Sequence, residues 1–334
     1  MPAVIRTPVT VHRDEHLNLT LQNTKKENIF ITCSGKRDGV GAQVQAVFST
    51  MLFAREMDIT YVHTPFEKIE HNDLADEAWA AKWEDFFSLG LGELKRGELS
   101  PGIDEIHLLP REVRRLKKAL NREEHSANSG LLTNADKGVL FAIKHCHPYA
   151  DRFPNKYSNF VKEWREKYHF SSKDKYDIHD KEPSIRIAIH ARRNDVTKTG
   201  KYAHRYTANS QIVAILKQVL PVLSRFDVPL SITLHSSGEP DEFQELIELR
   251  PDLKLLLSEC TFTTFHSLVS ADVLIMAKSS FSYAAALLSQ GVKIYEPFWH
   301  SPLDSWLVAT QSNIDENALE RKVCEVLRIR EDER

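Results

Sequence analysis

Short apolar runs alternate with helical periodicity along the first half of the chain. Residues 28–33 (NIFITC) and 59–63 (ITYVH) are bounded, β-prone runs that predict buried strands, and residues 44–56 between them form an amphipathic helical pattern. This order predicts a β-α-β unit. A further helix is predicted over residues 76–87, with Trp79, Trp83 and Phe86 on one face, and more helices over residues 139–168, interrupted at Pro148 and Pro154.

The same alternation returns after a polar interruption at residues 171–183 (SSKDKYDIHDKEP), which we interpret as a linker. Strands are predicted beyond it at residues 185–190, 230–235, 253–257, 273–276 and 292–295. Helices are predicted at residues 211–224, from residue 281, and at 315–329, where Asp315 or Asn313 is the expected cap. Alternating strands and helices at this spacing predict an α/β fold with parallel, doubly wound sheets.

The predicted domains are residues 1–178, residues 179–312 and a closing C-terminal helix in residues 313–334. A chain of 334 residues is long enough for two domains, each with its own core. The 44 basic and 47 acidic residues give a net charge of −3, so we expect no nucleic-acid partner. No segment reaches the ~18 apolar residues of a membrane span, and no signal peptide is recognisable, so we expect a cytoplasmic location.

The strongest chemical signal is the run RIAIHARRND, where the predicted strand 185–190 continues into Arg192 and Arg193. Ligands of α/β proteins bind beyond the carboxyl ends of the strands. Arginine is permanently charged, and its fork of donors fits the paired oxygens of a phosphate or carboxylate. The pair therefore predicts an anionic ligand, against the alternative that it is an exposed loop held by salt bridges.

A second signal follows at residues 271–288 (ADVLIMAKSSFSYAAALL), which combine a strand, a small polar turn and an apolar helix. Ser279 or Ser280 is expected to cap that helix and to leave backbone N–H groups at its amino terminus free. A helix amino terminus with hydroxyl groups facing two arginines would hold a diphosphate.

These segments resemble the fucosyltransferase-like glycosyltransferases that carry the HxRRxD signature, a group that includes α1,2-, α1,6- and protein O-fucosyltransferases. The matching stretches are GVGAQ at residues 39–43, HARRND at 190–195 and the SSFS core within 272–288, followed by YEPFWHSPLDSW. The resemblance implies two Rossmann-like domains of the GT-B type, which face each other across a cleft. It also implies GDP-fucose as donor without a metal, a saccharide acceptor bound mainly by residues 1–178, and a nucleotide-sugar domain in residues 179–312.

The resemblance also implies the site residues. Arg192, Arg193 and Asp195 are the candidate catalytic residues. The candidate donor-binding residues are His190, Arg192, Arg193, Gly39, Gly41, His235, Ser236, Asp272, Ser279, Ser280, Phe281 and Ser282. Arg192 and Arg193 would neutralise the departing diphosphate.

The chain departs from the family at two positions. Gly200 stands where α1,6-type members have a glutamate, so the base is open between Asp195 and, as the weaker candidate, His204. Asp195 has the alternative role of pairing with Arg193. Thr264 stands where some relatives have an aspartate for the guanine amino group.

Several alternatives accompany this interpretation. Gly39 and Gly41 also fit a simple tight β-α turn, and the missing third glycine disfavours an NAD-dependent oxidoreductase. Another nucleotide sugar as donor, or a non-catalytic nucleotide- or glycan-binding protein, remains open. No Asp-x-Asp follows a strand and the four cysteines form no CxxC, so no metal is expected. We expect Trp299 to pack in the core.

Overall fold

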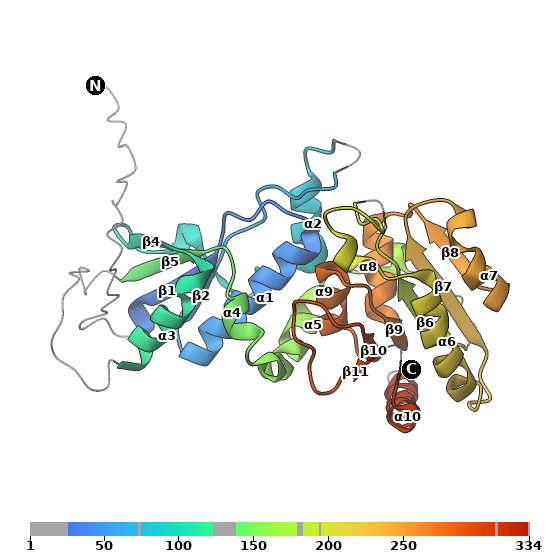
Figure 1. Cartoon of the computed structure of the whole chain (residues 1–334). Helices are drawn as coiled ribbons and strands as arrows, with labels where there is room; N and C mark the ends of the chain where they lie inside the picture. Colours follow the sequence, from blue (N-terminus) through green and yellow to red (C-terminus); the bar gives the residue numbers. More distant parts are fainter. Residues whose placement is uncertain are drawn as a thin grey trace.

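The computed structural model describes residues 26–72, 75–122, 138–178, 183–193, 195–310 and 313–332. Over these ranges the chain forms two β-sheets with helices packed around them, and the two halves lie side by side (Figure 1). Every strand pair within the two sheets is parallel. The predicted α/β fold with two Rossmann-like halves is therefore confirmed.

The first sheet has the strand order β3-β2-β1-β5-β4. Its strands are β1 (Ile29–Cys33), β2 (Thr60–His63), β3 (Leu94–Lys95), β4 (Asp104–Leu108) and β5 (Val139–Ile143). The predicted β-α-β unit is present, with α1 (Val40–Met57) between β1 and β2. The prediction of helix at the start of residues 139–168 is wrong, because β5 is a central strand that is buried throughout. A short apolar run fits a buried strand and a buried helix equally well.

Four more helices belong to the first half, and proline marks the start of two helical segments there. Pro148 stands in the first turn of α4 and Pro154 begins a 3-10 helix. The helices are α2 (Trp79–Phe87), α3 (Val113–Arg122), α4 (His147–Ala150) and α5 (Val161–His169). The 3-10 segments are Lys26–Asn28, Arg96–Glu98, Pro110–Glu112, Pro154–Asn159 and Asp174–Tyr176.

The second sheet has the strand order β11-β10-β9-β6-β7-β8. Its strands are β6 (Ile185–His190), β7 (Leu230–Ser236), β8 (Lys254–Leu257), β9 (Val273–Ile275), β10 (Val292–Tyr295) and β11 (Leu307–Val308). Its helices are α6 (Asn209–Leu223), α7 (Gln244–Leu249), α8 (Thr261–Ser270), α9 (Ser280–Leu288) and α10 (Glu316–Asp332), with 3-10 segments Ala203–Arg205 and Pro240–Phe243. The carboxyl end of the central strand β6 is His190, as the sequence predicted.

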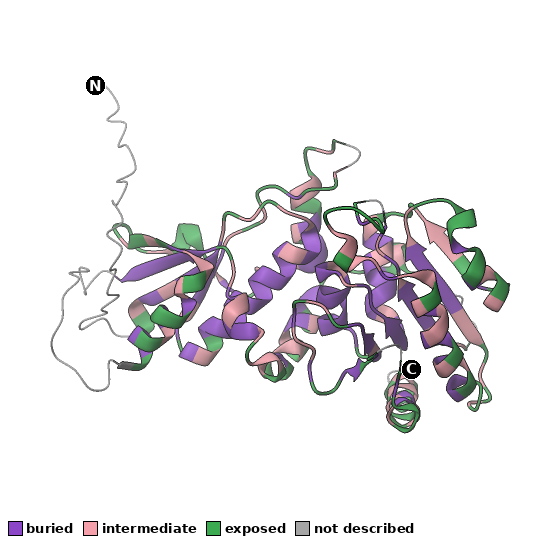
Figure 2. Ribbon diagram, viewed as in Figure 1, coloured by how far each residue is buried: buried purple, intermediate pink, exposed green. Residues whose placement is uncertain are grey.

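One apolar core extends across both halves, and a second core lies within the second half. Helix α1 packs against its own sheet and also against α9 of the second half. The common core includes Phe48 and Phe53 of α1 together with Tyr283 and Ala285 of α9. The helix predicted to be amphipathic is therefore buried on nearly all sides, and even Gln45 is 1% exposed (Figure 2).

The stretch interpreted as a linker also packs into this structure. The Tyr176 ring stacks on Phe262 with centroids 5.5 Å apart, and the Lys173 ammonium lies 4.8 Å from the centre of the Tyr168 ring. Residues 179–182, where the boundary was predicted, lie outside the described residues. The halves are thus joined by packing as well as by the connecting chain.

Gly41 permits a close backbone contact between the two halves. A Cβ atom added at Gly41 would lie 2.3 Å from the Phe281 Cα and 2.4 Å from the Phe281 nitrogen. Both atoms belong to the backbone, which cannot rotate away. The absence of a side chain at Gly41 therefore lets the amino-terminal turns of α1 and α9 touch.

A buried carboxylate fastens the closing helix to the second sheet. Asp272 is 3% exposed and accepts hydrogen bonds from the Arg186 backbone N–H at 2.7 Å and from Arg330 Nη1 of α10 at 2.7 Å. The Arg186 guanidinium adds two contacts of 3.3 Å. Helix α10 begins next to Asp315, whose Oδ1 accepts from the Ala318 N–H, so the predicted cap is confirmed.

We predict that Gly41→Ala lowers the free energy of unfolding by about 1–3 kcal/mol, because the new methyl group overlaps backbone atoms of α9. Urea unfolding would measure the loss. The control is Gly97→Ala, since nothing lies within 4 Å of a Cβ at Gly97. Equal stability of the two variants would contradict the close contact.

We predict that Asp272→Asn lowers the free energy of unfolding by about 1.5–3 kcal/mol, because it removes the charge that accepts from two arginines. Asp252→Asn is the control, since Asp252 is an exposed carboxylate paired with Arg250 and should cost less than about 0.5 kcal/mol. An Asp272→Asn variant as stable as the wild type would refute the structural role.

Candidate functional site

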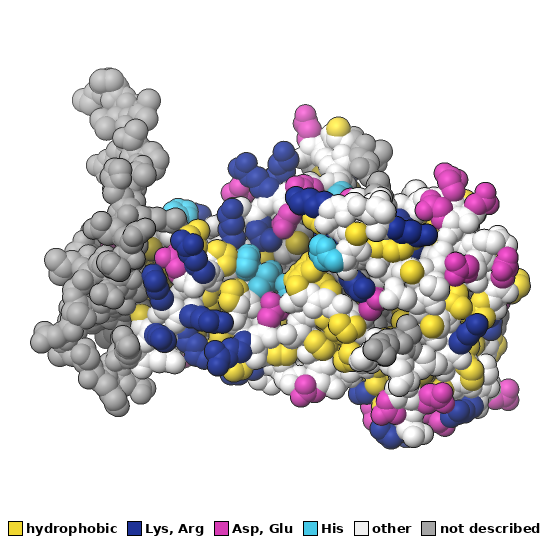
Figure 3. All heavy atoms as spheres, in the orientation of Figure 1, with side chains coloured by type: hydrophobic (Ala, Val, Ile, Leu, Met, Phe, Trp, Pro, Cys, Tyr) yellow, Lys and Arg dark blue, Asp and Glu magenta, His cyan; other side chains and the backbone are white. Residues whose placement is uncertain are grey.

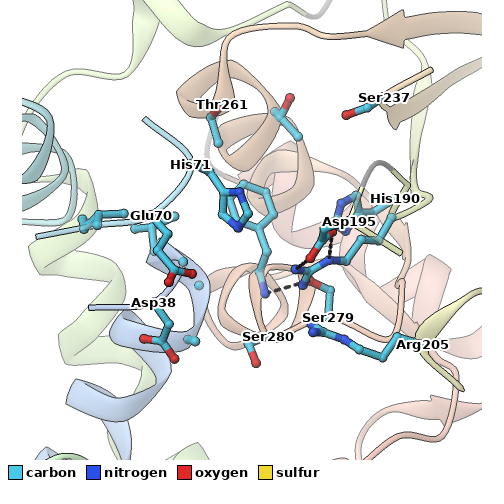
Figure 4. A pocket seen from close by; sticks show the side chains of 18 of the residues that line it. Asp38, Glu70, His71, His190, Asp195, Arg205, Ser237, Thr261, Ser279 and Ser280 are labelled. Carbon is cyan, nitrogen blue, oxygen red and sulfur yellow. Dashed lines mark hydrogen bonds and ion pairs between the residues drawn. The ribbon is translucent and has the colours of Figure 1, made fainter. Parts of the chain in front are cut away.

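A cavity of about 840 Å³ lies where the two halves meet. The first half contributes the loop before α1, residues around His71, and Asp151 after α4. The second half contributes the residues after β6 and the start of α9. Figure 4 shows Asp38, Glu70 and His71 on one side and Asp195 and Ser279 on the other. The cavity occupies the carboxyl end of β6, where α/β proteins bind ligands.

Arg192 connects the two segments that the sequence singled out, the arginine loop after β6 and the turn before α9. Its Nη1 donates to Ser279 Oγ at 3.2 Å, so the arginine loop and the amino terminus of α9 are in direct contact. Its Nε and Nη2 donate to the two oxygens of Asp195 at 3.0 and 2.6 Å. Asp195 thus pairs with Arg192, which corrects the expectation that it pairs with Arg193.

The pairing changes the chemistry available to Asp195. Desolvation raises its pKa, but the hydrogen bonds and charge of Arg192 outweigh this effect and bring the pKa below its ordinary value. A carboxylate that holds its charge this firmly is a weak acceptor for a proton. The position of Asp195 therefore fits a residue that orients Arg192 better than it fits a catalytic base.

Arg193 forms no ion pair with a carboxylate among the residues that the structure describes, although the charge of Glu242 is near enough to raise its pKa. It is 7% exposed, its Nη2 donates to Asn209 Oδ1 at 2.7 Å, and its Nη1 donates to the Arg192 carbonyl at 3.1 Å. The guanidinium lies 4.2 Å from the centre of the Tyr206 ring. Desolvation lowers its pKa below the ordinary arginine value. A buried cation with neutral partners on the wall of a cavity has unused capacity for an anion.

His190 lies at the end of β6 and is held by Ser282. The Ser282 hydroxyl contacts His190 Nδ1 and accepts from the Ala277 N–H at 3.2 Å. Burial, together with the charge of Arg192, lowers the pKa of His190 to about 3. The imidazole is therefore neutral. Ser282 is fully buried and is not part of the cavity wall, so it supports His190, whereas the sequence analysis expected it to contact the donor.

The start of α9 presents donors to the cavity. Ser279 is the N-cap residue, and its Oγ accepts from the Phe281 N–H at 3.3 Å, as the sequence predicted for Ser279 or Ser280. Ser279, Ser280 and Phe281 all line the cavity. Gly39, the N-cap of α1, and Gly41 line the same cavity from the first half. Two helix amino termini, each the positive end of a helix dipole, therefore meet at one place.

The remaining expected site residues divide into two groups. His235 and Ser236 line the cavity, with His235 Nε2 2.8 Å from Ser267 Oγ and Ser236 Oγ donating to the Ala191 carbonyl at 2.6 Å. Asp272 lies at the amino end of β9, the opposite end of the sheet from His190, and is absent from the cavity wall. This corrects the expectation that Asp272 contacts a donor. A sequence motif gives the order of residues but not which end of a strand each one occupies.

Sequence analysis missed a third arginine in the cavity. The side chain of Arg205 has a buried Nε without a hydrogen-bond partner among the described residues. Its guanidinium lies 4.7 Å from the centre of the Trp299 ring. Trp299 is 47% exposed and lines the cavity, so the expectation that it packs in the core is wrong. The only sequence signal was the basic and aromatic run YAHRY that follows Gly200.

The first half adds an aromatic wall. Trp79 and Trp83 of α2 line the cavity, and the indole nitrogens of both are buried without a partner among the described residues. Trp83 packs on Phe262 of α8 with ring centroids 4.0 Å apart. Thr264 of α8, where some relatives have an aspartate, also lines the cavity. Sequence analysis placed the tryptophans on one helix face but did not connect that face to the site.

The described part of the chain lacks two further features. It contains no group of three or more His, Cys, Asp or Glu side chains arranged to hold a metal ion. Among the same residues, none of the helices combines the length and apolar character required to cross a membrane.

Comparison with known proteins gives the following similarities. No protein-family model matches the chain, and no curated protein matches it in sequence. Solved structures similar to it include the fucosyltransferase NodZ from Bradyrhizobium, with 14% identity, a TM-score of 0.38 and coverage of 79% of this chain and 94% of that chain. A mutant of Arabidopsis thaliana FUT1 in complex with GDP has 10% identity, a TM-score of 0.42 and coverage of 86% and 74%. POFUT1 in complex with GDP-fucose has 12% identity, a TM-score of 0.37 and coverage of 79% and 94%. These values describe a general likeness, and the functional proposal rests on the residues of the site.

Proposed function

We propose that the chain is an inverting, metal-independent glycosyltransferase that transfers L-fucose from GDP-fucose to a saccharide acceptor. The observation that carries the proposal is Arg193, a buried cation on the cavity wall without a carboxylate partner among the described residues. Arg192 and Arg205 line the same cavity, beside the amino terminus of α9. A diphosphate supplies the negative charge that this arrangement lacks.

The proposed chemistry is stabilisation of the leaving group. As the bond between the sugar and the β-phosphate breaks, charge grows on the phosphate oxygen, and Arg192 and Arg193 neutralise it from fixed positions. Neutral His190 adds a hydrogen bond through Nε2, since Nδ1 is engaged by Ser282. The backbone N–H of Ser280 and the dipole at the amino terminus of α9 add to this stabilisation. Asp195 acts here as the residue that orients Arg192.

Residues 179–312 are proposed to bind the donor, and residues 1–178 to contribute mainly to the acceptor side. Attack from the face opposite the diphosphate inverts the anomeric carbon, so a β-linked donor yields an α-linked product. The exposed Trp299 and the open cavity around Asp38, Glu70 and His71 offer a surface for a sugar. Arginines perform here the task that a divalent cation performs in other glycosyltransferases.

A second candidate is the same reaction with another nucleotide sugar. Thr264, in the place of an aspartate that accepts from guanine, favours this candidate. A non-catalytic nucleotide- or glycan-binding protein would keep donor binding but lack turnover. Comparison of GDP with UDP, and of binding with product formation, separates these alternatives.

We predict that GDP raises the melting temperature in the presence of EDTA, by about 5 °C at one hundred times its dissociation constant, which corresponds to about 2.7 kcal/mol. UDP should give a smaller shift and NAD none. Differential scanning fluorimetry measures all three. A shift that requires added Mg²⁺ or Mn²⁺ would contradict the arginine-only site, and a larger shift with UDP would favour the second candidate.

We predict that Arg192→Ala and Arg193→Ala each reduce kcat with GDP-fucose by about a hundredfold or more, because each removes charge stabilisation from the leaving group. Arg193→Lys should recover only part of the activity, since lysine lacks the planar fork. Arg225→Ala is the control, because Arg225 is half exposed and pairs with Glu320 away from the cavity. Near-normal turnover of both alanine variants would show that the donor binds at another site.

A further inference from the structure

A group of histidines lies beside the proposed donor site. The ring centroids of His145 and His147 are 4.2 Å apart, and those of His147 and His300 are 4.9 Å apart. Figure 3 shows histidine side chains gathered near the middle of the molecule, where the halves meet. Of the three, His147 and His300 line the cavity, as does Asp151. The role assigned to the arginines uses none of these side chains.

His300 and Asp151 form a pair that crosses the junction of the two halves. His300 Nδ1 lies 3.0 Å from Asp151 Oδ1 and 3.3 Å from Oδ2. Asp151 follows α4 in the first half, and His300 follows β10 in the second. Because an ionised carboxylate only accepts hydrogen bonds, Nδ1 carries the proton. In the neutral imidazole, Nε2 then has a free lone pair, and no hydrogen bond to it is present among the described residues.

The backbone around His300 is fixed by tyrosines. Tyr295 Oη donates to the His300 carbonyl, and Tyr283 Oη donates to the Ser301 carbonyl at 2.7 Å. The His300 residue is 3% exposed, and its ring lies 5.4 Å from that of Tyr283. A ring held in this way loses little freedom when a ligand arrives, as a preorganised catalytic group requires.

Four other side chains of the cavity are less suited to accept a proton. Asp195 is engaged by Arg192, and Asp38 is paired with Lys36 at 2.8 Å. Burial, with His145 and His300 nearby, keeps the pKa of His147 well below its ordinary value. Glu70 is exposed, so water competes with an acceptor hydroxyl for its carboxylate.

We propose that His300, oriented by Asp151, is the catalytic base that activates the acceptor hydroxyl. The inference rests on the proposed function. His300 Nε2 takes the hydroxyl proton as the acceptor oxygen bonds to the anomeric carbon. The bond from that carbon to the β-phosphate oxygen breaks, and its electron pair leaves with GDP. Asp151 stabilises the imidazolium that forms, as a positioning residue.

The test uses the full chain with GDP-fucose and a panel of mono- and disaccharide acceptors, and it measures GDP release and product. We predict that His300→Gln and His300→Ala each lower kcat by about a hundredfold or more, while GDP affinity changes less than about twofold. Added imidazole should restore at least about tenfold of the activity of His300→Ala, because it can occupy the vacated space. Asp151→Asn should lower kcat by at least about tenfold.

His145→Gln is the matched control, since His145 belongs to the same histidine group but is not part of the cavity wall. It should keep near-normal kcat. The inference is overturned if His300→Gln keeps half of the wild-type kcat. It is also overturned if imidazole fails to restore the activity of His300→Ala and GDP affinity falls together with activity, because a purely structural contact between His300 and Asp151 would give that result. Loss of kcat in Glu70→Gln with full activity in His300→Gln would assign the base to Glu70. A wild-type chain that binds GDP but turns over no donor would instead refute the proposed function, and the base with it.

Discussion

The contact between α1 and α9 is the constraint on which the rest of the structure depends. It requires Gly41, because any side chain there would overlap the backbone of Phe281. The contact brings the amino termini of two helices from different sheets to one cavity, and it buries α1 between both halves. The apolar core that joins the halves therefore also places the positive ends of two helix dipoles beside three arginines.

That arrangement gathers Arg192, Arg193 and Arg205 on one cavity wall. Asp195 balances Arg192, but Arg193 is held by an amide, a carbonyl and an aromatic ring. Burial of such a cation destabilises the ligand-free protein, and binding of an anion beside it offsets this loss. Burial of a charge without a counter-ion is thus a structural argument for a ligand, whereas the exposed pair of Arg250 and Asp252 carries no such implication.

Packing between the halves also determines which groups can act together. His300 and Asp151 come from different halves and form one pair only because the segment after β10 lies against the end of α4. Arg205 and Trp299 are likewise distant in sequence and adjacent in space. A site composed in this way is sensitive to any displacement of one half, so variants of core residues between α1 and α9 should affect chemistry as well as stability.

The sequence by itself determined the strands and helices whose patterns are local, and the position of HARRND at the end of a buried strand. It also limited the cap of α9 to Ser279 or Ser280, because a small polar turn before an apolar helix is a local signal, and the structure places the cap at Ser279. It could not determine that residues 139–143 form a central strand, since burial on both faces removes the alternation that distinguishes strand from helix. Only the tertiary structure decided that Asp272 fastens α10, that Asp195 pairs with Arg192, and that Arg205 and His300 reach the cavity. These outcomes depend on contacts between segments far apart in the chain, which no local pattern of residues encodes.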